Sequence, residues 1–252
     1  MSSSDSRVVL ISGASRGIGR ACAIAFAEQG ATVVINHPGE REAAEEAAQL
    51  VSESGGKPLG LQADVGSVEE VRRLAHTIHQ EFGRLDVAVL NAGICPFTSF
   101  LDIDESEWDR VHSVNLKGMF FLTQAVAPMM MSARAGRVIA VSSLSAIRGE
   151  VSEVHYCASK AGVLGLIRAL AVVLGPYGIT CNAVLPGPIE TDINREWLAQ
   201  EDRRAHFESR IPLGRVGEAR DVARVVRLLA SEDASYINGA SVSVDGGMAI
   251  QL

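Results

Sequence analysis

The chain has 252 residues, which allows one large domain or two small ones and is ample for a hydrophobic core. Hydrophobic residues make up 47% and charged residues 21%, a balance that excludes an intrinsically disordered chain. The formal net charge is −7, so no nucleic-acid partner is expected, because phosphate binding needs a basic face.

The sequence gives no sign of a membrane partner or of export. No apolar run reaches the roughly 20 residues that cross a bilayer. Residues 1–6 are polar, carry no secretion signal and are expected to be disordered. The four cysteines lie far apart without metal-binding spacing, which predicts reduced thiols in a cytoplasmic protein and no metal site. They are Cys22, Cys95, Cys157 and Cys181.

Short aliphatic runs alternate with segments of helical periodicity along the chain. The predicted elements, in chain order, are strand 7–12, helix 18–29, strand 32–36, helix 40–54, strand 58–63, helix 68–82, strand 85–90, helix 106–131, strand 136–142, helix 154–174, strand 179–185, helix 219–230 and strand 240–244. The segment 188–215 lacks this pattern and is interpreted as a substrate lid of one or two helices. No linker interrupts the alternation, so residues 7–252 are predicted to form one domain with a parallel sheet.

A glycine-rich turn at residues 12–19 joins the first predicted strand to the first helix. Gly13, Gly17 and Gly19 lack side chains, so the backbone can turn sharply and a pyrophosphate can approach it. The following helix offers unpaired N–H groups and a partial positive charge to phosphates. The fold class is therefore predicted as α/β, a single-domain Rossmann fold with a doubly wound, seven-stranded parallel sheet and helices on both faces.

The glycine spacing is G-x-x-x-G-x-G, not the G-x-G-x-x-G of most dinucleotide folds, and here the chain resembles the short-chain dehydrogenase/reductase family. The resemblance covers nearly the whole chain. Its further motifs are Asp64-Val65, Asn91-Ala92-Gly93, Asn115, Ser143, Tyr156-x-x-x-Lys160 and Pro186-Gly187. It implies an NAD(P)-dependent oxidoreductase that transfers hydride between an alcohol and nicotinamide.

The expected cofactor contacts lie along these motifs. They are Gly13, Ser15, Arg16, Gly17, Ile18, Gly19, Asn36, His37, Asp64, Val65, Asn91, Ala92, Gly93, Tyr156, Lys160, Pro186, Gly187, Ile189 and Thr191. By resemblance, Asp64 accepts a hydrogen bond from the adenine amino group, and Thr191 with the Ile189 backbone binds the carboxamide. The alternative for Asp64 is a cap of the helix that opens at Ser67.

The second strand ends in Asn36-His37 rather than in a carboxylate that would bind the ribose of NAD. Arg16, with help from His37, could bind a 2′-phosphate instead. NADP is therefore favoured, with NAD as the alternative. Arg16 could equally be a solvated turn residue.

Tyr156 and Lys160 are four residues apart in a predicted helix, so their side chains share one face. Hydride transfer needs a group that moves a proton in step with it. A free phenol ionises near pH 10, and a neighbouring ammonium lowers the pKa of Tyr156 toward neutrality. By resemblance, Ser143 binds the substrate oxygen, and Asn115 holds a water that links Lys160 to solvent. Taken singly, each residue also has an ordinary structural explanation.

The predicted substrate walls, at 94–97, 145–153 and 192–197, mix polar and aromatic residues, which suits a polyol ring better than an acyl chain. The sequence of residues 91–97, 177–179 and 191–194 resembles that of bacterial aldose 1-dehydrogenases that act on L-rhamnose and related 6-deoxy sugars. Such an enzyme would oxidise C1 to the lactone. Glu153 stands where a neutral amide is expected. The candidate substrate-binding residues are Cys95, Ser143, Ser145, Glu153, Tyr156, Asn194 and Arg195.

Three alternatives stay open. The first is a 3-oxoacyl-thioester reductase, whose acidic carrier protein would dock on an arginine rim that includes Arg195 and Arg204. The second is a dehydrogenase of an anionic sugar such as sulfoquinovose, bound by Arg148 or Arg195. The third is a catalytically silent nucleotide-binding regulator. The resemblance also implies a homotetramer, with helices 106–131 and 154–174 paired between subunits.

Overall fold

The computed structural model describes residues 6–191 and 195–251, and its centre is a seven-stranded parallel sheet. The strand order is β3-β2-β1-β4-β5-β6-β9, and every adjacent pair is parallel. The strands are β1 (Val8–Ile11), β2 (Thr32–His37), β3 (Lys57–Gln62), β4 (Val87–Leu90), β5 (Gly136–Val141), β6 (Ile179–Pro186) and β9 (Ser241–Val244). The predicted fold class is confirmed.

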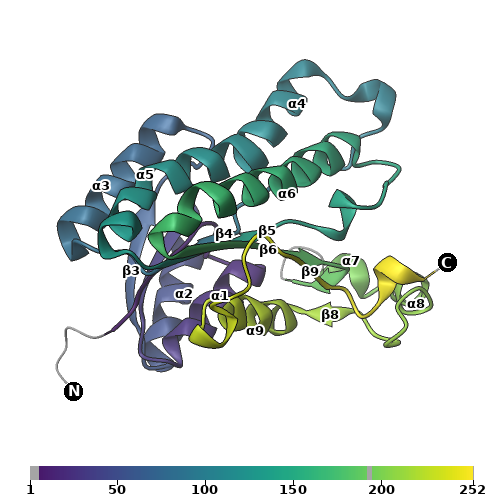
Figure 1. The fold of residues 1–252 in the computed structure, drawn as a ribbon. Helices are drawn as coiled ribbons and strands as arrows, with labels where there is room; N and C mark the ends of the chain where they lie inside the picture. Colours follow the sequence, from purple (N-terminus) through teal and green to yellow (C-terminus); the bar gives the residue numbers. More distant parts are fainter. Residues whose placement is uncertain (1–5, 192–194, 252) are drawn as a thin grey trace.

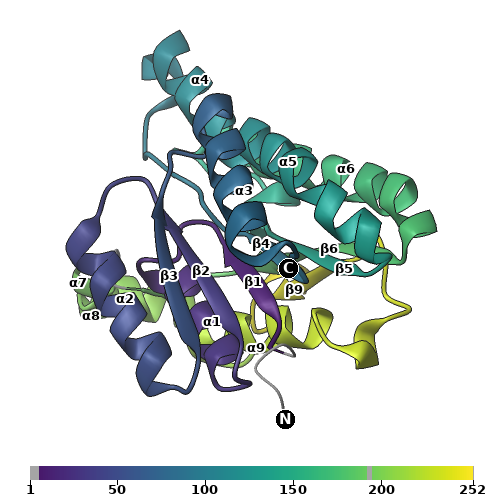
Figure 2. The same ribbon diagram turned by 90° about the vertical axis from the view of Figure 1, so that its left-hand side faces the viewer.

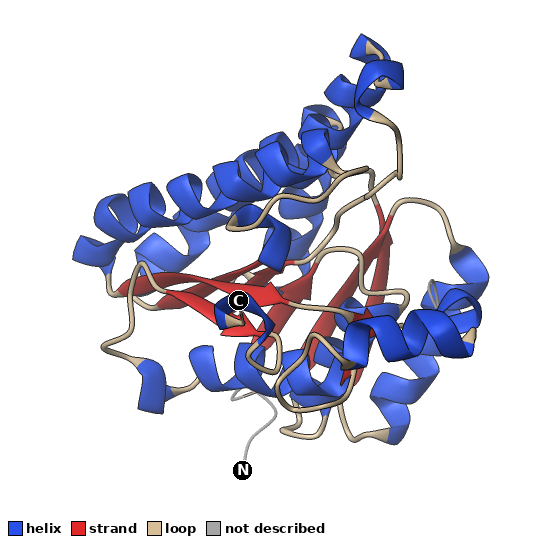
Figure 3. Ribbon diagram, turned by 90° about the vertical axis from the view of Figure 1, so that its right-hand side faces the viewer, coloured by secondary structure: helices blue, strands red, loops and turns tan. Residues whose placement is uncertain are grey.

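Helices cover both faces of the sheet (Figures 1 and 2). One layer holds α1 (Gly17–Ala27), α2 (Arg41–Glu53) and α9 (Ala219–Leu229), and the other holds α3 (Val68–Phe82), α5 (Gly118–Ala133) and α6 (Val154–Leu174). Figure 3 shows the strands lying between the two layers. Successive residues of β1 enter opposite cores, Leu10 on one side and Val9 and Ile11 on the other, because side chains alternate along a strand.

The predicted helix 106–131 is continuous but not uniform. It runs as α4 (Glu105–His112), a π-helical turn η2 (Ser113–Lys117) and then α5, with Pro128 inside α5. A π turn adds one residue to the helical repeat and often marks a functional position. Hydrophobic periodicity could not reveal it, since the apolar spacing changes by a single residue.

Helix α6 is the longest helix of the described residues, and Lys160 and Arg168 interrupt its apolar residues. The segment Val154–Tyr177 is long and apolar enough, by length and composition, to cross a membrane. Its residues Val163 and Ile167 pack in the core against the sheet. The apolar outer face, with Val172 and Val173, explains why its composition resembles that of a membrane helix.

The segment predicted as a lid contains β7 (Ile189–Glu190), α7 (Arg195–Leu198) and α8 (Glu201–Glu208). The strand β7 pairs with β8 (Gly217–Glu218), a two-stranded sheet that the sequence did not reveal because two residues show no alternation. The lid is anchored by Ile211, which packs with Leu144 and Met248 in a small apolar cluster. The remaining short helices are η1 (Phe100–Asp102), η3 (Leu144–Ala146), η4 (Gly175–Tyr177), η5 (Glu232–Ala234) and η6 (Met248–Ile250).

Candidate active site

The site lies where the strand order reverses, between β1 and β4, at the carboxyl ends of the strands. The turn after β1 depends on glycine at each motif position. Gly13 and Gly17 have φ angles of +64° and +58°, which residues other than glycine rarely adopt. A Cβ on Gly19 would overlap the carbonyl oxygen of Gly13. The backbone can therefore approach a phosphate here without steric hindrance.

Asn91, at the end of β4, fastens this turn to the neighbouring strand. Its Nδ2 donates to the carbonyl oxygens of Ser12 at 3.0 Å and Gly13 at 2.9 Å. The hydroxyl of Ser12 accepts from the backbone N–H groups of Asn91 and Ala92, both at 3.0 Å. Asn91 was predicted as a cofactor contact, and the structure shows that its amide also holds the turn in shape. Ser12 was missed, although a serine between an aliphatic strand and a glycine turn is a recognisable signal.

The N-terminus of α1 opens on this turn. Its N-cap is Arg16, whose side chain makes no capping hydrogen bond within the described chain, and its first turn holds no acidic residue. Thr191 also reaches the turn, since a Cβ on Gly17 would lie 3.5 Å from its Cγ2. Free N–H groups and glycine-sized space are what a pyrophosphate requires, so these residues fit a dinucleotide cofactor.

At the adenosine-ribose end, the guanidinium of Arg16 pairs with Glu40, with 2.9 Å between Nη2 and Oε1. The amide of Asn36 donates to the carbonyl oxygens of Leu61 and Ala63, so it joins β2 to the chain beyond β3. Burial lowers the pKa of His37, with Glu40 acting against that shift. At neutral pH His37 therefore carries little charge to offer a phosphate.

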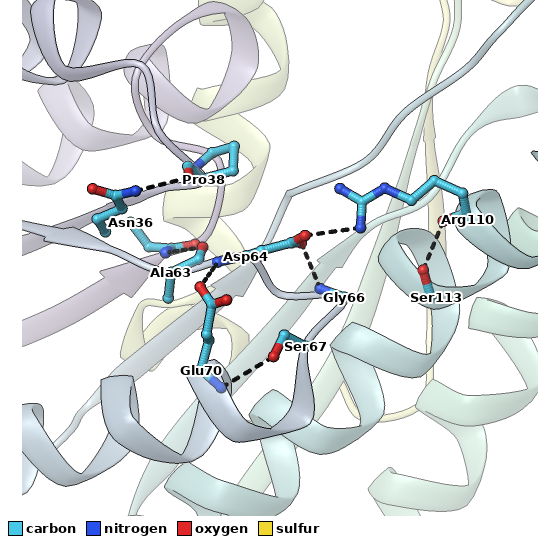
Figure 4. Close-up of polar contacts among 10 residues, drawn as sticks. Asn36, Pro38, Ala63, Asp64, Gly66, Ser67, Glu70, Arg110 and Ser113 are labelled. Atoms are coloured by element: carbon cyan, nitrogen blue, oxygen red, sulfur yellow. Dashed lines mark hydrogen bonds and ion pairs between the residues drawn. The ribbon is translucent and has the colours of Figure 1, made fainter.

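The carboxylate of Asp64 is held from two sides (Figure 4). Its Oδ1 accepts from the Gly66 N–H and its Oδ2 from the Arg110 guanidinium, both at 2.8 Å. The cap of α3 is Ser67, which accepts from the N–H of Glu70 at 3.4 Å. The helix-cap alternative for Asp64 is therefore not what the structure shows. Arg110 was not among the predicted residues.

Ser143, Tyr156 and Lys160 come together from the end of β5 and the first two turns of α6. The ammonium of Lys160 lies 5.6 Å from the centroid of the Tyr156 ring and donates to the Val141 carbonyl at 2.9 Å. Burial raises the pKa of Tyr156, Cys95 adds to this shift, and a hydrogen bond with Ser143 opposes it. Burial also lowers the pKa of Lys160 to about 8. The protein surroundings alone therefore raise the pKa of Tyr156, and the predicted lowering would need further positive charge.

Asn115 is fully buried in the π turn, next to this group. Its amide donates to the Ile94 carbonyl at 2.9 Å and to Ser159 Oγ at 3.1 Å, and it accepts from the Ile94 N–H at 2.8 Å. A Cβ on Gly93 would lie 3.2 Å from Lys160 Nζ and 3.3 Å from Asn115 Oδ1. The loop after β4 thus passes directly over both residues because position 93 is glycine.

A second polar group lies on the predicted substrate side. The Ser145 hydroxyl donates to Glu153 Oε2 at 3.2 Å. Glu153 also raises the pKa of the Cys95 thiol, after the larger effect of burial. Burial raises the pKa of Glu153, while the hydrogen bond from Ser145 opposes that shift. The negative charge of Glu153 in turn raises the pKa of Tyr156, which places the two groups in the same electrostatic environment.

The other predicted residues are distributed around the lid. Arg195 Nε lies 3.5 Å from Glu190 Oε1, and Arg204 pairs with the other oxygen of Glu190. Gly187 passes close to Asp245, where a Cβ would lie 2.8 Å from the Asp245 Cβ. Asn194 lies outside the described residues. The structure describes the other predicted site positions, including Ser15, Ile18, Val65, Ala92, Pro186 and Ile189.

Comparisons with known proteins agree with this geometry. Residues 13–249 match the family described as enoyl-(acyl carrier protein) reductase. An L-rhamnose 1-dehydrogenase (NAD(P)(+)) of Azotobacter vinelandii is 46% identical, with 98% of each chain covered. A 3-oxoacyl-[acyl-carrier-protein] reductase of Staphylococcus epidermidis is 39% identical, over 95% of this chain and 97% of the relative.

A solved structure leads to the same family. A putative short-chain alcohol dehydrogenase from Sinorhizobium meliloti superposes with a TM-score of 0.93 at 35% identity, covering 98% of this chain and 97% of that one. The backbone architecture therefore agrees along nearly the whole chain. The chain therefore belongs to the short-chain dehydrogenase/reductase family and is an NAD(P)-dependent oxidoreductase that acts on CH–OH groups.

Proposed function

We propose that the protein oxidises L-rhamnose, or a closely related 6-deoxyaldose, at C1 to the lactone. The observation that carries the proposal is the polar group of Ser145 and Glu153, joined by a hydrogen bond, in the electrostatic environment of Tyr156. Such a group suits a ring of hydroxyls, because each hydroxyl can both donate and accept. The 46% identity to an L-rhamnose 1-dehydrogenase over nearly the full length supports the same substrate class.

In this proposal Tyr156 takes the proton of the C1 hydroxyl. A bound oxidised nicotinamide would supply the hydride acceptor and a positive charge. Ionising the phenol must overcome the effect of burial, which raises the pKa of Tyr156. Ser143 works against burial through its hydrogen bond, and a protonated Lys160, with its ammonium 5.6 Å from the ring, favours the phenolate. Asn115 is proposed to hold a water beside Lys160, through which the proton reaches solvent.

Glu153 is proposed to form a hydrogen bond with a ring hydroxyl of the sugar. A neutral carboxyl can donate and a carboxylate only accepts, and the raised pKa of Glu153 widens the pH range in which the donor form exists. Ser145 already donates to one carboxyl oxygen, which leaves the other for the sugar. The predicted partner of Glu153 in this role, Asn194, remains a candidate from the sequence.

A 3-oxoacyl-thioester reductase is the second candidate, supported by the 39% identical relative. Docking an acidic carrier protein needs free positive charge on the rim of the site. Glu190 accepts ion pairs from both Arg195 and Arg204, which reduces that charge. The same pairing weighs against Arg195 as the binder of an anionic sugar such as sulfoquinovose.

A substrate panel tests the proposal. Reduction of NADP or NAD, followed at 340 nm, is measured with L-rhamnose, L-lyxose, L-mannose, D-glucose and sulfoquinovose, and NADPH oxidation with acetoacetyl thioesters. We expect the highest kcat/KM with L-rhamnose or a sugar sharing its C1 to C3 configuration. A higher value with the thioester, or turnover of none of them, contradicts the proposal, and the latter result favours a silent regulator.

We propose that the preference between NADP and NAD depends on the ion pair of Arg16 and Glu40. Arg16 is the planar donor that a 2′-phosphate would engage, and Glu40 is the first acid after β2. Because Glu40 already holds Arg16, it competes with the phosphate of NADP and repels it. Arg16 is therefore proposed to favour NADP, and Glu40 to limit that preference so that NAD is still accepted.

Helices α5 and α6 are proposed to contact other subunits in a homotetramer. The support is apolar exposure on α5 and α6, at Phe120, Val172 and Val173. The C-terminal Ile250 is likewise exposed. Light scattering coupled to size-exclusion chromatography is expected to give four times the chain mass of 26.7 kDa, and a monomer would contradict this. The cytoplasmic location stays a prediction.

Replacing Tyr156 by phenylalanine removes only the phenolic oxygen. We expect Tyr156→Phe to lower kcat by about 10²- to 10⁴-fold, the usual contribution of an acid–base group, with an unchanged dissociation constant for NADP. Stopped-flow kinetics and calorimetric titration measure the two quantities. Tyr236→Phe, at a fully exposed tyrosine, is the matched control and should keep the parental rate. Equal rates in both variants would contradict the assigned role.

Replacing Glu40 by glutamine keeps its size and removes its charge. We expect Glu40→Gln to raise the ratio of kcat/KM with NADP to that with NAD by about two- to fivefold, because an exposed ion pair is worth at most about 1 kcal/mol. Arg16→Gln should lower the same ratio. Glu46→Gln, which breaks the ion pair between Glu46 on α2 and Arg20 on α1, is the control and should leave the ratio unchanged. An unchanged ratio in Glu40→Gln would exclude the proposed competition.

A further inference from the structure

An arginine from α4 reaches across to the carboxylate at the adenine end of the site (Figure 4). Arg110 Nη1 donates to Asp64 Oδ2 at 2.8 Å, and the two residues are 46 positions apart in sequence. The Gly66 N–H fixes the other oxygen, Oδ1, at 2.8 Å. The carboxylate is therefore held by one bond on each oxygen, which sets the plane in which its remaining lone pairs point.

The half-exposed side chain of Arg110 passes close to the Asp64 loop. A Cβ on Gly66 would lie 2.7 Å from Arg110 Nη1, so the guanidinium occupies the space that a side chain at position 66 would need. The hydroxyl of Ser113 donates to the Arg110 carbonyl at 2.9 Å, at the start of the π turn. The backbone of that turn also packs against the Asp64 loop, since a Cβ on Gly118 would lie 2.7 Å from the Val65 carbonyl oxygen.

We propose that Arg110 is a positioning residue for adenine recognition, acting by orienting the Asp64 carboxylate toward the 6-amino group of the cofactor. The inference rests on the nicotinamide dinucleotide as cofactor and on the expected contact of Asp64 with adenine. A carboxylate oxygen that accepts one hydrogen bond retains a lone pair for a second donor. Without Arg110 only the bond from the Gly66 N–H remains, so the carboxylate can turn about Oδ1, and the acceptor Oδ2 is no longer fixed where the amino group arrives.

This role predicts selectivity for the base rather than for the rest of the cofactor. Nicotinamide hypoxanthine dinucleotide carries a carbonyl oxygen in place of the 6-amino group of adenine. A fixed carboxylate accepts a hydrogen bond from the amino group of adenine. The carbonyl oxygen of hypoxanthine is itself an acceptor and offers the carboxylate no hydrogen bond, so the site discriminates between the two cofactors. Such discrimination is large where a site is built to accept a hydrogen bond from one group and the competing ligand carries an acceptor at that position.

The experiment compares NAD with nicotinamide hypoxanthine dinucleotide, using kcat/KM and the dissociation constant of each. For the parental protein we expect a preference for NAD of about tenfold, the ratio that corresponds to about 1.4 kcal/mol. Arg110→Ala should reduce that preference to within about twofold of the value in Asp64→Ala, and the double variant should show no further loss. Arg110→Lys, which keeps the charge, should restore part of it.

Two controls separate the inference from its premises. Arg73→Ala removes an exposed arginine paired with Glu69 on α3 and should keep the full preference. Nicotinamide mononucleotide, which lacks adenine, should bind the parental and Arg110→Ala proteins equally. If Asp64→Ala also retains the preference, the adenine contact of Asp64 is wrong. If Asp64→Ala loses the preference and Arg110→Ala keeps it, the positioning role of Arg110 alone is overturned.

Discussion

The amide of Asn91 makes the hydrogen bonds on which the rest of the site depends. It joins the carbonyl oxygens of Ser12 and Gly13 to the end of β4, and so fixes the turn between β1 and α1 at the point where the strand order reverses. Gly13, which has a positive φ angle, is held directly by this contact. An open turn of this shape would otherwise lose its geometry, because glycine has more conformational freedom than any other residue.

The helix that passes through α4, the π turn and α5 contributes residues to two polar groups of the candidate site. Arg110 pairs with Asp64, the residue expected to contact adenine, and Asn115 lies five residues further on, beside Lys160. The π turn that contains Asn115 adds one residue to the helical repeat and so changes the direction of the side chains that follow Arg110. The long helix therefore supplies polar residues to the candidate site as well as apolar residues to the outer layer.

Burial favours the neutral form of both Tyr156 and Lys160. Around Tyr156, burial and the nearby Glu153 and Cys95 raise the pKa of the phenol, so the protein by itself favours the neutral side chain. Burial also lowers the pKa of Lys160, so its positive charge is held at a cost. A phenol that ionises only when further positive charge arrives would restrict proton removal to the assembled complex.

The sequence by itself determined the fold class, nearly all of the strand and helix positions, and the identity of the glycine turn and of Ser143, Tyr156 and Lys160. The elements follow from local periodicity, and the glycine turn and the Ser143, Tyr156 and Lys160 positions follow from motifs that resemble those of the family, such as the four-residue spacing that places Tyr156 and Lys160 on one face of α6. Tertiary structure alone decided the partners that come from distant segments. The pairing of Arg110 with Asp64, of Arg16 with Glu40 and of Glu190 with the lid arginines depends on which loops meet at the sheet edge. No local pattern encodes such contacts, because an ion pair across 46 residues leaves no periodic trace in either segment.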